Sequence, residues 1–594
     1  MSDLHPPDAE QAEGHCLRAQ QLWAQGQLAP ARASFARAAF CDPGQSRYWR
    51  LLDQALAGTV ADQISERLRR CLWDGIEELR LDPAELPNVV YSFVCSQPTL
   101  QGWIQGRRAG TLATALETLR GLPHDADPEL CRMLGLVRVL GVEPELTLQS
   151  LRRFLLHDAT SPALPSKAMT QLAVALSYPC FASDYAWYRD ADEDAQVDSL
   201  KTDLSALTEA ALLDERRWFQ LAVLACYEPL SQLPQSGALL TAAPHSQRAD
   251  FTRLLRAQII EPQAEAALRA QIQQLGAIDD PVSLAVRAQY EASPFPRWQT
   301  QPNWLPGRGD RSQLRLLPAL LQHPAPRILV AGCGTGKHPI ATAMSYPQAE
   351  VLAIDLSLSS LAYAQRKSDE LGLRNLRFLR ADLLSCADLE TRFDAIESMG
   401  VLHHLADPRR GLRALLAVLK PRGWLRLGLY SATARRDITA LREQTATATI
   451  EPTPKGLRAF RWGVLHSQHE PRSRFVASVP DFFNLHECRD LLFHVQEHVF
   501  TLPAIEQLLG EVGLVLRRFE LPSEVPFAHY RRMFPGDVEM TDLQNWAQLE
   551  QRYPDTFIAM YQFWTQRRSD DRSGQDDEPS SDDLAGAEKR SKPA

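Results

Sequence analysis

The sequence predicts an α/β protein in which an all-α region precedes a doubly wound parallel sheet, and three observations support this prediction. Between about residues 12 and 275, the apolar residues recur at helical spacing. From residue 327 onward, short apolar runs of strand length alternate with helical stretches, the order that builds a parallel sheet covered by helices. Glycine or an acidic residue follows several of these runs, at the sheet edge where such folds bind ligands.

The composition is that of an ordinary globular chain with room for several domains. Of the 594 residues, 45% are hydrophobic and 23% are charged, so sizeable cores can form. A formal net charge of -9 gives no basic face for nucleic acid, and we expect no nucleic-acid partner. The ten cysteines include no Cys-x-x-Cys pair, so neither a zinc site nor a disulfide framework is expected.

The same residues predict a cytoplasmic protein. The first residues lack the basic and apolar regions of a secretory signal. No uninterrupted apolar run approaches the length of a membrane span, so no membrane partner is expected.

Residues 12–43 predict a helix–turn–helix unit. Small residues at fixed positions let two antiparallel helices approach closely, and the positions that match the tetratricopeptide pattern are Ala19, Leu22, Gly26, Leu28, Ala31, Phe35, Ala38 and Pro43. One repeat cannot bury its own face, so neighbouring helices are required. Further helices are predicted at residues 47–57, 61–72, 129–140, 145–156, 166–177, 199–213 and 216–226. We therefore assign 1–11 to a flexible N-terminus and 12–280 to an α-helical repeat (solenoid) domain.

Two functions are open for this solenoid. Its surface could dock a protein or peptide partner, as repeat proteins do with their extended concave faces. It could equally form a structural wall over the domain that follows. The residues do not choose between these two functions.

The most informative stretch carries three glycines at alternate positions, Gly332, Gly334 and Gly336. They follow an apolar strand predicted at 328–331, and glycine permits both a sharp turn and close contact with a ligand. A helix then begins, with its N-terminal amides toward the ligand. A second apolar run, 351–354, ends in Asp355, where nucleotide-binding folds place the acid that grips a ribose diol.

Three classes of ligand loop compete for this pattern. A phosphate-binding loop of the G-x-x-x-x-G-K-[ST] type requires wider glycine spacing and a hydroxyl group where His338 stands. A dinucleotide fingerprint, G-x-G-x-x-G, requires the third glycine one residue later. The G-x-G-x-G form with a later acid resembles motif I of class I S-adenosylmethionine-dependent methyltransferases. The resemblance implies S-adenosyl-L-methionine as the cofactor, with the glycines and Cys333 at its methionine end and Asp355 on its ribose.

The next elements agree with the Rossmann-like, doubly wound, seven-stranded sheet of that family. Strands are predicted at 376–380, 393–397, 425–430, 514–519 and 560–564, and helices at 358–371, 410–420 and 502–512. By the same resemblance, Asp382 contacts the adenine amino group. The neighbouring residues assigned with it to the cofactor site are Leu356, Leu383, Ser398 and Met399.

Residues 398–405 resemble motif IV of small-molecule methyltransferases, which often ends in a pair of histidines, here His403 and His404. They are unlike the Asn/Asp-Pro-Pro-Tyr motif of amino-group methyltransferases that act on adenine or glutamine. Histidine transfers protons near neutral pH, so His403 or His404 is the candidate catalytic base. Either side chain could instead cap the helix or bond to the backbone.

An aromatic segment, residues 290–298, precedes the sheet. Its Tyr-Glu-x-x-Pro-aromatic-Pro-Arg-Trp pattern and the later segments 489–498 and 555–564 resemble a bacterial family of tetratricopeptide-repeat methyltransferase fusions. The resemblance spans most of the chain. The candidates for contact with cofactor or substrate here are Tyr290, Phe295, Arg297 and Trp298. Aromatic rings at this place could stabilise a sulfonium cation, or they could simply pack against the first helix of the sheet domain.

The methyltransferase domain is assigned to residues 281–568. An insertion at about 431–490 is expected over the active-site mouth, either as part of the substrate pocket or as a decorative loop. A helical insert is expected at about 525–555. The Ser/Asp-rich acidic tail, 569–594, has little to bury and is expected to be disordered.

Residues 494–498 match the H-x-x-E-H zinc-protease pattern. No third ligand is identifiable from the sequence, and Pro503 ends the predicted helix shortly afterwards, so no metal is expected. His494 and His498 are instead candidates to line or support the acceptor pocket.

The sequence therefore predicts an S-adenosylmethionine-dependent methyltransferase that moves a methyl group to an acceptor by in-line displacement. The acceptor, a protein, a peptide or a small molecule, is not determined by the residues. The alternative is a non-catalytic scaffold that binds a partner through its repeats, with the methyltransferase fold as a cofactor-binding or structural module.

Overall fold

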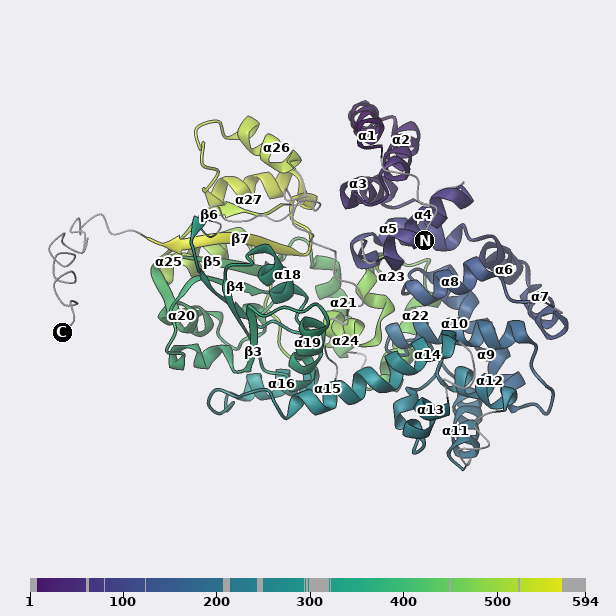
Figure 1. Cartoon of the computed structure of the whole chain (residues 1–594). Helices are drawn as coiled ribbons and strands as arrows, with labels where there is room; N and C mark the ends of the chain where they lie inside the picture. The colour runs from purple at the N-terminus through teal and green to yellow at the C-terminus, as the bar shows by residue number, and fades with distance from the viewer. Residues whose placement is uncertain are drawn as a thin grey trace, which may run out of the picture.

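The computed structural model describes residues 8–59, 64–78, 81–122, 124–206, 214–242, 249–292, 294, 298, 320, 322–447, 450–521 and 524–568. Helices fill the N-terminal half of the chain, and a sheet with its own helices fills the C-terminal half (Figure 1). Within these residues, no helix combines the length and the apolar content needed to cross a membrane. The predicted disordered tail, 569–594, and residues 1–7 of the predicted flexible N-terminus lie outside the described residues.

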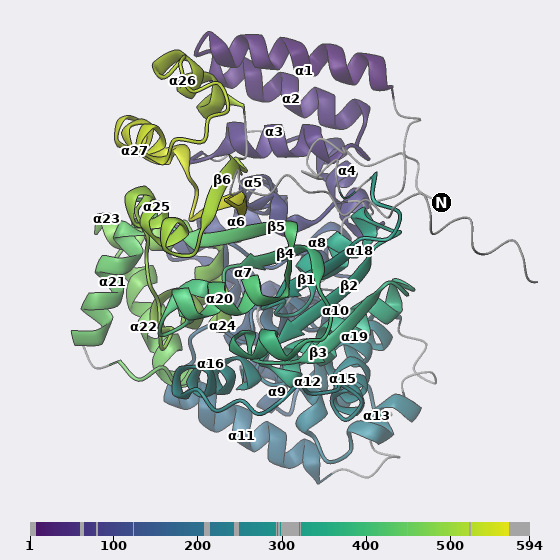
Figure 2. The same ribbon diagram turned by 90° about the vertical axis from the view of Figure 1, so that its left-hand side faces the viewer.

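The N-terminal helices begin with the antiparallel pair α1 (Ala9–Ala24) and α2 (Leu28–Cys41). Small buried residues at their contact, such as Ala19 and Ala38, let the two backbones approach closely. Gly26, with φ +75°, makes the turn in the left-handed region that favours glycine. The next helix, α3 (Ser46–Leu56), stacks beside α2, and Figure 2 shows the three helices side by side.

The helices that follow continue the same hydrophobic core. They are α4 (Glu66–Glu77), α5 (Pro87–Cys95), α6 (Pro98–Ala109), α7 (Leu112–Glu117), α8 (Pro128–Leu136), α9 (Val142–Thr160), α10 (Lys167–Ala182), α11 (Ala191–Ser205), α12 (Glu215–Leu224), α13 (Ser236–Ala242) and α14 (Ala249–Leu255). Helices α15 (Glu261–Arg269) and α16 (Pro281–Ala292) instead pack against α19 (Leu358–Glu370) of the sheet region. The predicted all-helical region is therefore confirmed. The tetratricopeptide character of its repeats stays a prediction.

Capping residues explain why several predicted helix boundaries were displaced. The helix predicted at 61–72 begins at Glu66, because the Ser65 side chain accepts a hydrogen bond from the Leu68 backbone N–H. The helix predicted at 199–213 begins earlier, at Ala191. Its first turn is closed by a capping box between Asp190 and Glu193.

The sheet contains β1 (Arg327–Ala331), β2 (Glu350–Asp355), β3 (Leu376–Arg380), β4 (Phe393–Met399), β5 (Leu419–Tyr430), β6 (Leu514–Phe519) and β7 (Met560–Arg567). Their order is β3-β2-β1-β4-β5-β7-β6. The order reverses between β1 and β4, so the crevice at the carboxyl ends of these two strands is the expected ligand site. The predicted seven-stranded, doubly wound sheet is confirmed.

A wholly parallel sheet, however, was the wrong prediction, because β7 runs antiparallel to both β5 and β6. After β6 the chain forms α26 (Val525–Met533) and α27 (Leu543–Arg552), and then re-enters the sheet where Met560 pairs with Tyr430. This entry point lies at the carboxyl end of β5, so β7 must run the opposite way.

Helices cover both faces of the sheet. Successive residues of β1 alternate between two cores, with Ile328 in one and Leu329 in the other. Helices α18 (Lys337–Ser345) and α19 (Leu358–Glu370) pack against β2 and β3. Helices α20 (Pro408–Val418) and α25 (Leu502–Glu511) pack against β5 and β6.

The insertion after β5 is a layer of helices rather than a loop. It contains α21 (Arg436–Thr447), α22 (Pro454–His466), α23 (Pro471–Val476) and α24 (Leu485–Phe493), which lie between the sheet and the N-terminal helices (Figure 1). Arg461 on α22 makes a two-pronged ion pair with Glu145 on α9, with N···O distances of 3.1 and 2.8 Å. The side chains are 1% and 0% exposed.

Other contacts reinforce this junction. Arg138 pairs with Glu487 of α24 at 2.6 Å. The Tyr188 ring stacks on Trp462 with 4.8 Å between ring centroids. The insertion is thus docked on the N-terminal helices by buried polar and aromatic contacts.

We expect the substitution Arg461→Ala to lower the free energy of unfolding by about 3–5 kcal/mol, because it leaves the Glu145 carboxylate buried without a partner. Thermal unfolding of the full chain measures this effect. The matched control is Arg70→Ala, which removes an exposed pair with Glu66 whose side chains are each 67% exposed, and should change the unfolding free energy by less than about 1 kcal/mol. Equal effects of the two substitutions would contradict the assigned role of the buried pair.

Candidate active site

The loop after β1 has a conformation that requires its three glycines. Gly332, Gly334 and Gly336 have φ values of +77°, +51° and +85°, in the left-handed region. A side chain would also collide with neighbours. A Cβ atom on Gly332 would lie 2.3 Å from Val401, and one on Gly336 would lie 2.5 Å from Ala364. The loop therefore brings bare backbone to the crevice at the end of β1.

The acid at the end of β2 is locked in place by this loop. The Asp355 carboxylate accepts hydrogen bonds from the backbone N–H of Gly334 at 2.8 Å and of Ser357 at 3.0 Å. Burial raises the pKa of Asp355, and these N–H groups counteract part of the rise. Asp382, at the end of β3, accepts a bond from the Leu384 N–H at 2.9 Å. Both acids keep free lone pairs for a ligand.

A cavity of about 510 Å³ opens from this loop. The residues of the predicted cofactor site that line it are Gly332, Cys333, Gly334, Asp355, Leu356, Asp382, Leu383 and Met399. Gly336 does not line it, and instead forms the N-terminal cap of α18. Ser398 does not line it either, because its side chain is fully buried inside the sheet.

The two histidines of the motif IV segment have different surroundings. His404 lines the cavity, and its Nδ1–H donates to the Gln496 carbonyl oxygen at 2.8 Å. In the neutral ring this leaves the Nε2 lone pair toward the cavity. Burial, together with the nearby His494, lowers the pKa of His404 to about 3, so the ring is neutral at physiological pH.

His403 lies outside the cavity, contrary to its predicted role as a base. Its ring stacks on Tyr430 with a centroid distance of 3.7 Å and is fully buried. Neither of its ring nitrogens has a hydrogen-bond partner among the described residues. Burial, with the neighbouring His404, lowers the pKa of His403 well below its usual value.

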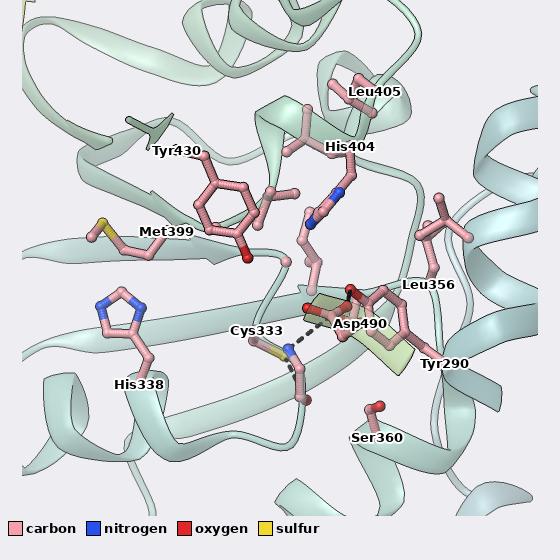
Figure 3. A pocket seen from close by; sticks show the side chains of 18 of the residues that line it. Tyr290, Cys333, His338, Leu356, Ser360, Met399, His404, Leu405, Tyr430 and Asp490 are labelled. Carbon is pink, nitrogen blue, oxygen red and sulfur yellow. Dashed lines mark hydrogen bonds between the residues drawn. The ribbon is translucent and has the colours of Figure 1, made fainter. Parts of the chain in front are cut away.

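Tyr430 is a cavity residue that sequence reasoning missed. The Arg435 guanidinium carbon lies 3.7 Å from the ring centroid, as close as His403, and so the two groups hold opposite faces of the ring. The hydroxyl group points into the cavity (Figure 3). Burial raises the pKa of Tyr430, so the hydroxyl keeps its proton. Its place as the last residue of β5 was the available signal.

Tyr290 of the predicted aromatic strap also lines the cavity. Its hydroxyl donates to the Asp490 carboxylate at 2.6 Å and lies 3.2 Å from Nε2 of His494. Figure 3 shows Tyr290, Asp490, His404 and Tyr430 around one space beside Cys333. The insertion residues Asp481 and Asp490 thus contribute to the cavity wall, and neither was predicted.

Among the predicted substrate residues that the structure describes, Trp298, His494 and His498 do not line the cavity. Trp298 is buried against α19, and its Nε1–H donates to the Thr335 carbonyl at 2.9 Å, so it supports the glycine loop from behind. His498 bonds to the Leu405 carbonyl at 3.0 Å and steadies the segment after η8 (Leu402–His404). Phe295 and Arg297 lie outside the described residues.

His404, Asp490 and His494 bring three metal-ligand types together, with ligand atoms within 4.8 Å of one another. Two ligands of one zinc ion lie at most about 4.2 Å apart, twice the usual metal–nitrogen distance. In addition, Nδ1 of His494 accepts the Gln496 backbone N–H at 3.1 Å. The proton of the neutral His494 ring therefore sits on Nε2, where it donates to Tyr290 and competes with a metal.

The zinc-protease pattern at 494–498 also lacks the helix it requires. Helix α24 ends at Phe493, so His494 and His498 do not share a helix face. The network of His494, Tyr290 and Asp490 is better described as a hydrogen-bonded support for the cavity wall.

Comparison with known proteins agrees with this geometry. Residues 328–423 match the family model described as a methyltransferase domain. An uncharacterized protein of Synechococcus sp. is 38% identical over 267 residues, which are 42% of this chain and 63% of that protein. The trans-aconitate 2-methyltransferase of Deinococcus radiodurans is 35% identical over 153 residues, 26% of this chain and 55% of that enzyme. The ubiquinone biosynthesis O-methyltransferase of Chromobacterium violaceum is 33% identical over 135 residues, which are 23% of this chain and 56% of that enzyme.

The chain spans between about half and just under two thirds of the length of these curated relatives. Among solved structures, PKMT2 from Rickettsia typhi is similar with 13% identity and a TM-score of 0.32, over 41% of this chain and 48% of that one. Residues 328–423 of this chain are thus similar to a methyltransferase domain. The residues that match the family model do not include the N-terminal helices.

We expect Asp355→Ala to weaken S-adenosylmethionine binding by about 100-fold, because a hydrogen bond to a charged group contributes about 1.5–3 kcal/mol. Calorimetric titration measures the affinity, and circular dichroism checks the fold. Asp388→Ala, at an exposed carboxylate after β3, is the matched control and should bind normally. Normal affinity in Asp355→Ala would overturn the assignment of the ribose site.

We also expect the protein to lose stability as the pH falls below about 6.5. The pKa values of His404 and His494 are lowered to about 3 in the folded protein, whereas an unfolded histidine has a pKa of about 6.5. Between these values only the unfolded chain binds the protons, so each histidine removes up to about 1.4 kcal/mol of stability per pH unit.

Melting temperatures of the wild type and of His404→Gln, measured between pH 7.5 and 5, test this expectation. The variant should show the shallower dependence on pH. His469→Gln, at a side chain that is 79% exposed, is the control and should keep the wild-type slope. Identical slopes in all three proteins would show that His404 is not held neutral.

Proposed function

We propose that this chain transfers a methyl group from S-adenosylmethionine to an acceptor bound in the same cavity. One observation carries the proposal. The glycine loop, Asp355 and Asp382 open into one cavity with His404 and Tyr430, so the cofactor-binding and reacting groups share a single space. A volume of about 510 Å³ lies in the usual range for ligand sites.

The residues present fit the cofactor. Backbone at Gly332 and Gly334 would meet its methionine end, Asp355 would accept hydrogen bonds from the ribose hydroxyls, and Asp382 would accept one from the adenine amino group. When bound, the cofactor supplies an activated methyl group on a sulfonium sulfur. The contribution of the protein is alignment, because it holds donor and acceptor at near-attack distance.

His404 and Tyr430 would act on the acceptor. The fixed Nδ1–H bond of His404 aims its Nε2 lone pair at the cavity, where it can accept a hydrogen bond from the acceptor group. Tyr430, clamped between His403 and Arg435, offers a hydroxyl group that keeps its proton. Asp490 is held in place by Tyr290. These groups would orient the reacting atom toward the methyl group.

We further propose that the N-terminal helices serve as the wall that positions the insertion over the cavity. The buried pair of Glu145 with Arg461 and the pair of Arg138 with Glu487 support this function. A second link joins the helices to the cofactor loop, because Lys337 pairs with Asp82 at 2.5 Å. A protein or peptide partner of these helices stays a prediction from the repeat pattern.

Calorimetric titration of the purified chain with S-adenosylmethionine and S-adenosylhomocysteine tests the proposed function, with NADH as the control nucleotide. We expect micromolar dissociation constants for the first two ligands and no heat of binding for NADH. Absence of binding by both sulfur ligands would contradict the proposal. Binding of NADH alone would move the chain to the oxidoreductases.

A further inference from the structure

The charges that face the cavity do not balance. Three permanent cations line it, Lys337, Arg426 and Arg435, and each is paired with a carboxylate that lies outside the cavity. Lys337 pairs with Asp82, Arg426 with Glu397 and Glu520, and Arg435 with Glu497, which Arg442 shares. Lys337 and Arg426 therefore contribute little free positive charge to the ligand.

The four carboxylates that line the cavity are in the opposite situation. They are Asp355, Asp382, Asp481 and Asp490, and among the described residues none of them forms an ion pair with lysine or arginine. Their recorded partners are backbone N–H groups for the first two, and the Tyr290 hydroxyl and His494 for Asp490. The lining thus presents carboxylates that have no cationic partner within ion-pair distance among the described residues.

Two of these four carboxylates have a place in the cofactor site, and two do not. Asp355 and Asp382 follow β2 and β3, where the ribose and adenine groups are expected. Asp481 and Asp490 come from the insertion and line the same cavity together with Tyr290 and Tyr430. Burial raises the pKa of Asp481, Arg138 and Arg435 counteract part of the rise, and the charge of Asp490 adds to it. Both carboxylates line one cavity and can therefore act on one ligand.

A second observation concerns His404, which lines the same cavity. His404 is 6% exposed, and its Nε2 atom has no hydrogen-bond partner among the described residues while the ring lines the cavity. Because Nδ1 holds the ring proton, Nε2 can only accept a hydrogen bond. Asp481, Asp490 and His404 therefore offer the methyl acceptor three groups that accept hydrogen bonds, two of them negatively charged.

From this arrangement we infer that the acceptor is a basic amine, whose N–H groups are bound by Asp481, Asp490 and Nε2 of His404. The inference rests on the proposed function. A hydroxyl group would satisfy only one of these three acceptors, and a carboxylate or phosphate would be repelled by two buried negative charges. A primary ammonium group carries three N–H hydrogens, one for each of these acceptors, and the neutral amine that reacts keeps two of them.

The charge balance of the transfer agrees with an amine. The ammonium form gives one proton to the solvent before reaction, and the neutral nitrogen lone pair then forms the C–N bond as the C–S bond breaks. S-Adenosylhomocysteine leaves as a neutral thioether, and the positive charge moves from sulfur to nitrogen. Asp481 and Asp490 would stabilise the charge that develops on the nitrogen in the transition state.

The test uses the bound cofactor as a local reporter. The full chain is saturated with S-adenosylmethionine carrying a ¹³C-labelled methyl group, and the chemical shift of that methyl signal is followed by NMR. Methylammonium chloride and sodium acetate, probes small enough for any pocket of this size, are titrated separately at constant ionic strength. We expect methylammonium to shift the signal saturably, at a concentration at least tenfold lower than acetate requires.

The variants Asp490→Asn and Asp481→Asn should each raise the half-saturating concentration of methylammonium at least threefold. Their unchanged affinity for S-adenosylmethionine is the check that the cofactor half is intact. Asp555→Asn, at an exposed carboxylate, is the matched control and should behave as the wild type.

Three results would overturn the inference. They are a methyl signal that acetate moves as readily as methylammonium, a signal that neither probe moves, and a loss of cofactor affinity in Asp490→Asn or Asp481→Asn. The last result would assign these carboxylates to the amino group of the cofactor. Failure of the proposed function itself looks different, because the wild type would then give no signal from a bound methyl group at all.

Discussion

The ion pair between Arg461 and Glu145 is the contact on which the acceptor half of the cavity depends. Arg461 also donates to the carbonyl oxygens of Ala186, in the N-terminal helices, and of Phe482, the residue after Asp481. One guanidinium group therefore joins the helical region to the backbone that carries a cavity carboxylate. Eight residues later the same segment supplies Asp490, so both acceptor-side carboxylates stand on a segment anchored to the N-terminal helices.

Such a pair fixes geometry more than it adds stability. Removing two charges from water is expensive, and their attraction repays that penalty only when geometry and hydrogen bonding are good. The N–H groups of Arg461 bond to one carboxylate and two carbonyl oxygens at the same time. Only one position of α22 allows all of these bonds to form. The buried pair of Arg435 with Glu497 works in the same way nearer the cavity, where it holds the guanidinium over Tyr430. A polar junction of this kind tolerates few alternative placements of the insertion.

The cofactor half of the site was predictable from sequence, and the acceptor half was not. Gly332, Asp355 and Asp382 follow consecutive strands of one βαβ series, so topology alone brings them to one edge. Asp490 reaches the cavity only because α24 docks on the N-terminal helices, and no local pattern encodes that contact. His403 and His404 show how sequence prediction fails at the scale of one residue, because adjacent positions in a 3-10 turn face different surroundings. Periodicity also could not reveal the direction of β7, which follows from where α27 returns the chain.

A negatively lined cavity has a consequence for the choice of reaction. It stabilises the sulfonium cation before the reaction, and stabilisation that is lost on the way to the transition state slows transfer. If the acceptor were an anion, the reaction would cancel the positive charge inside the cavity. Asp481 and Asp490 would then have no developing positive charge to stabilise in the transition state. A neutral amine keeps the positive charge and moves it toward those two carboxylates. Asp481 and Asp490 then favour the transition state, while the glycine loop, Asp355 and Asp382 hold the cofactor.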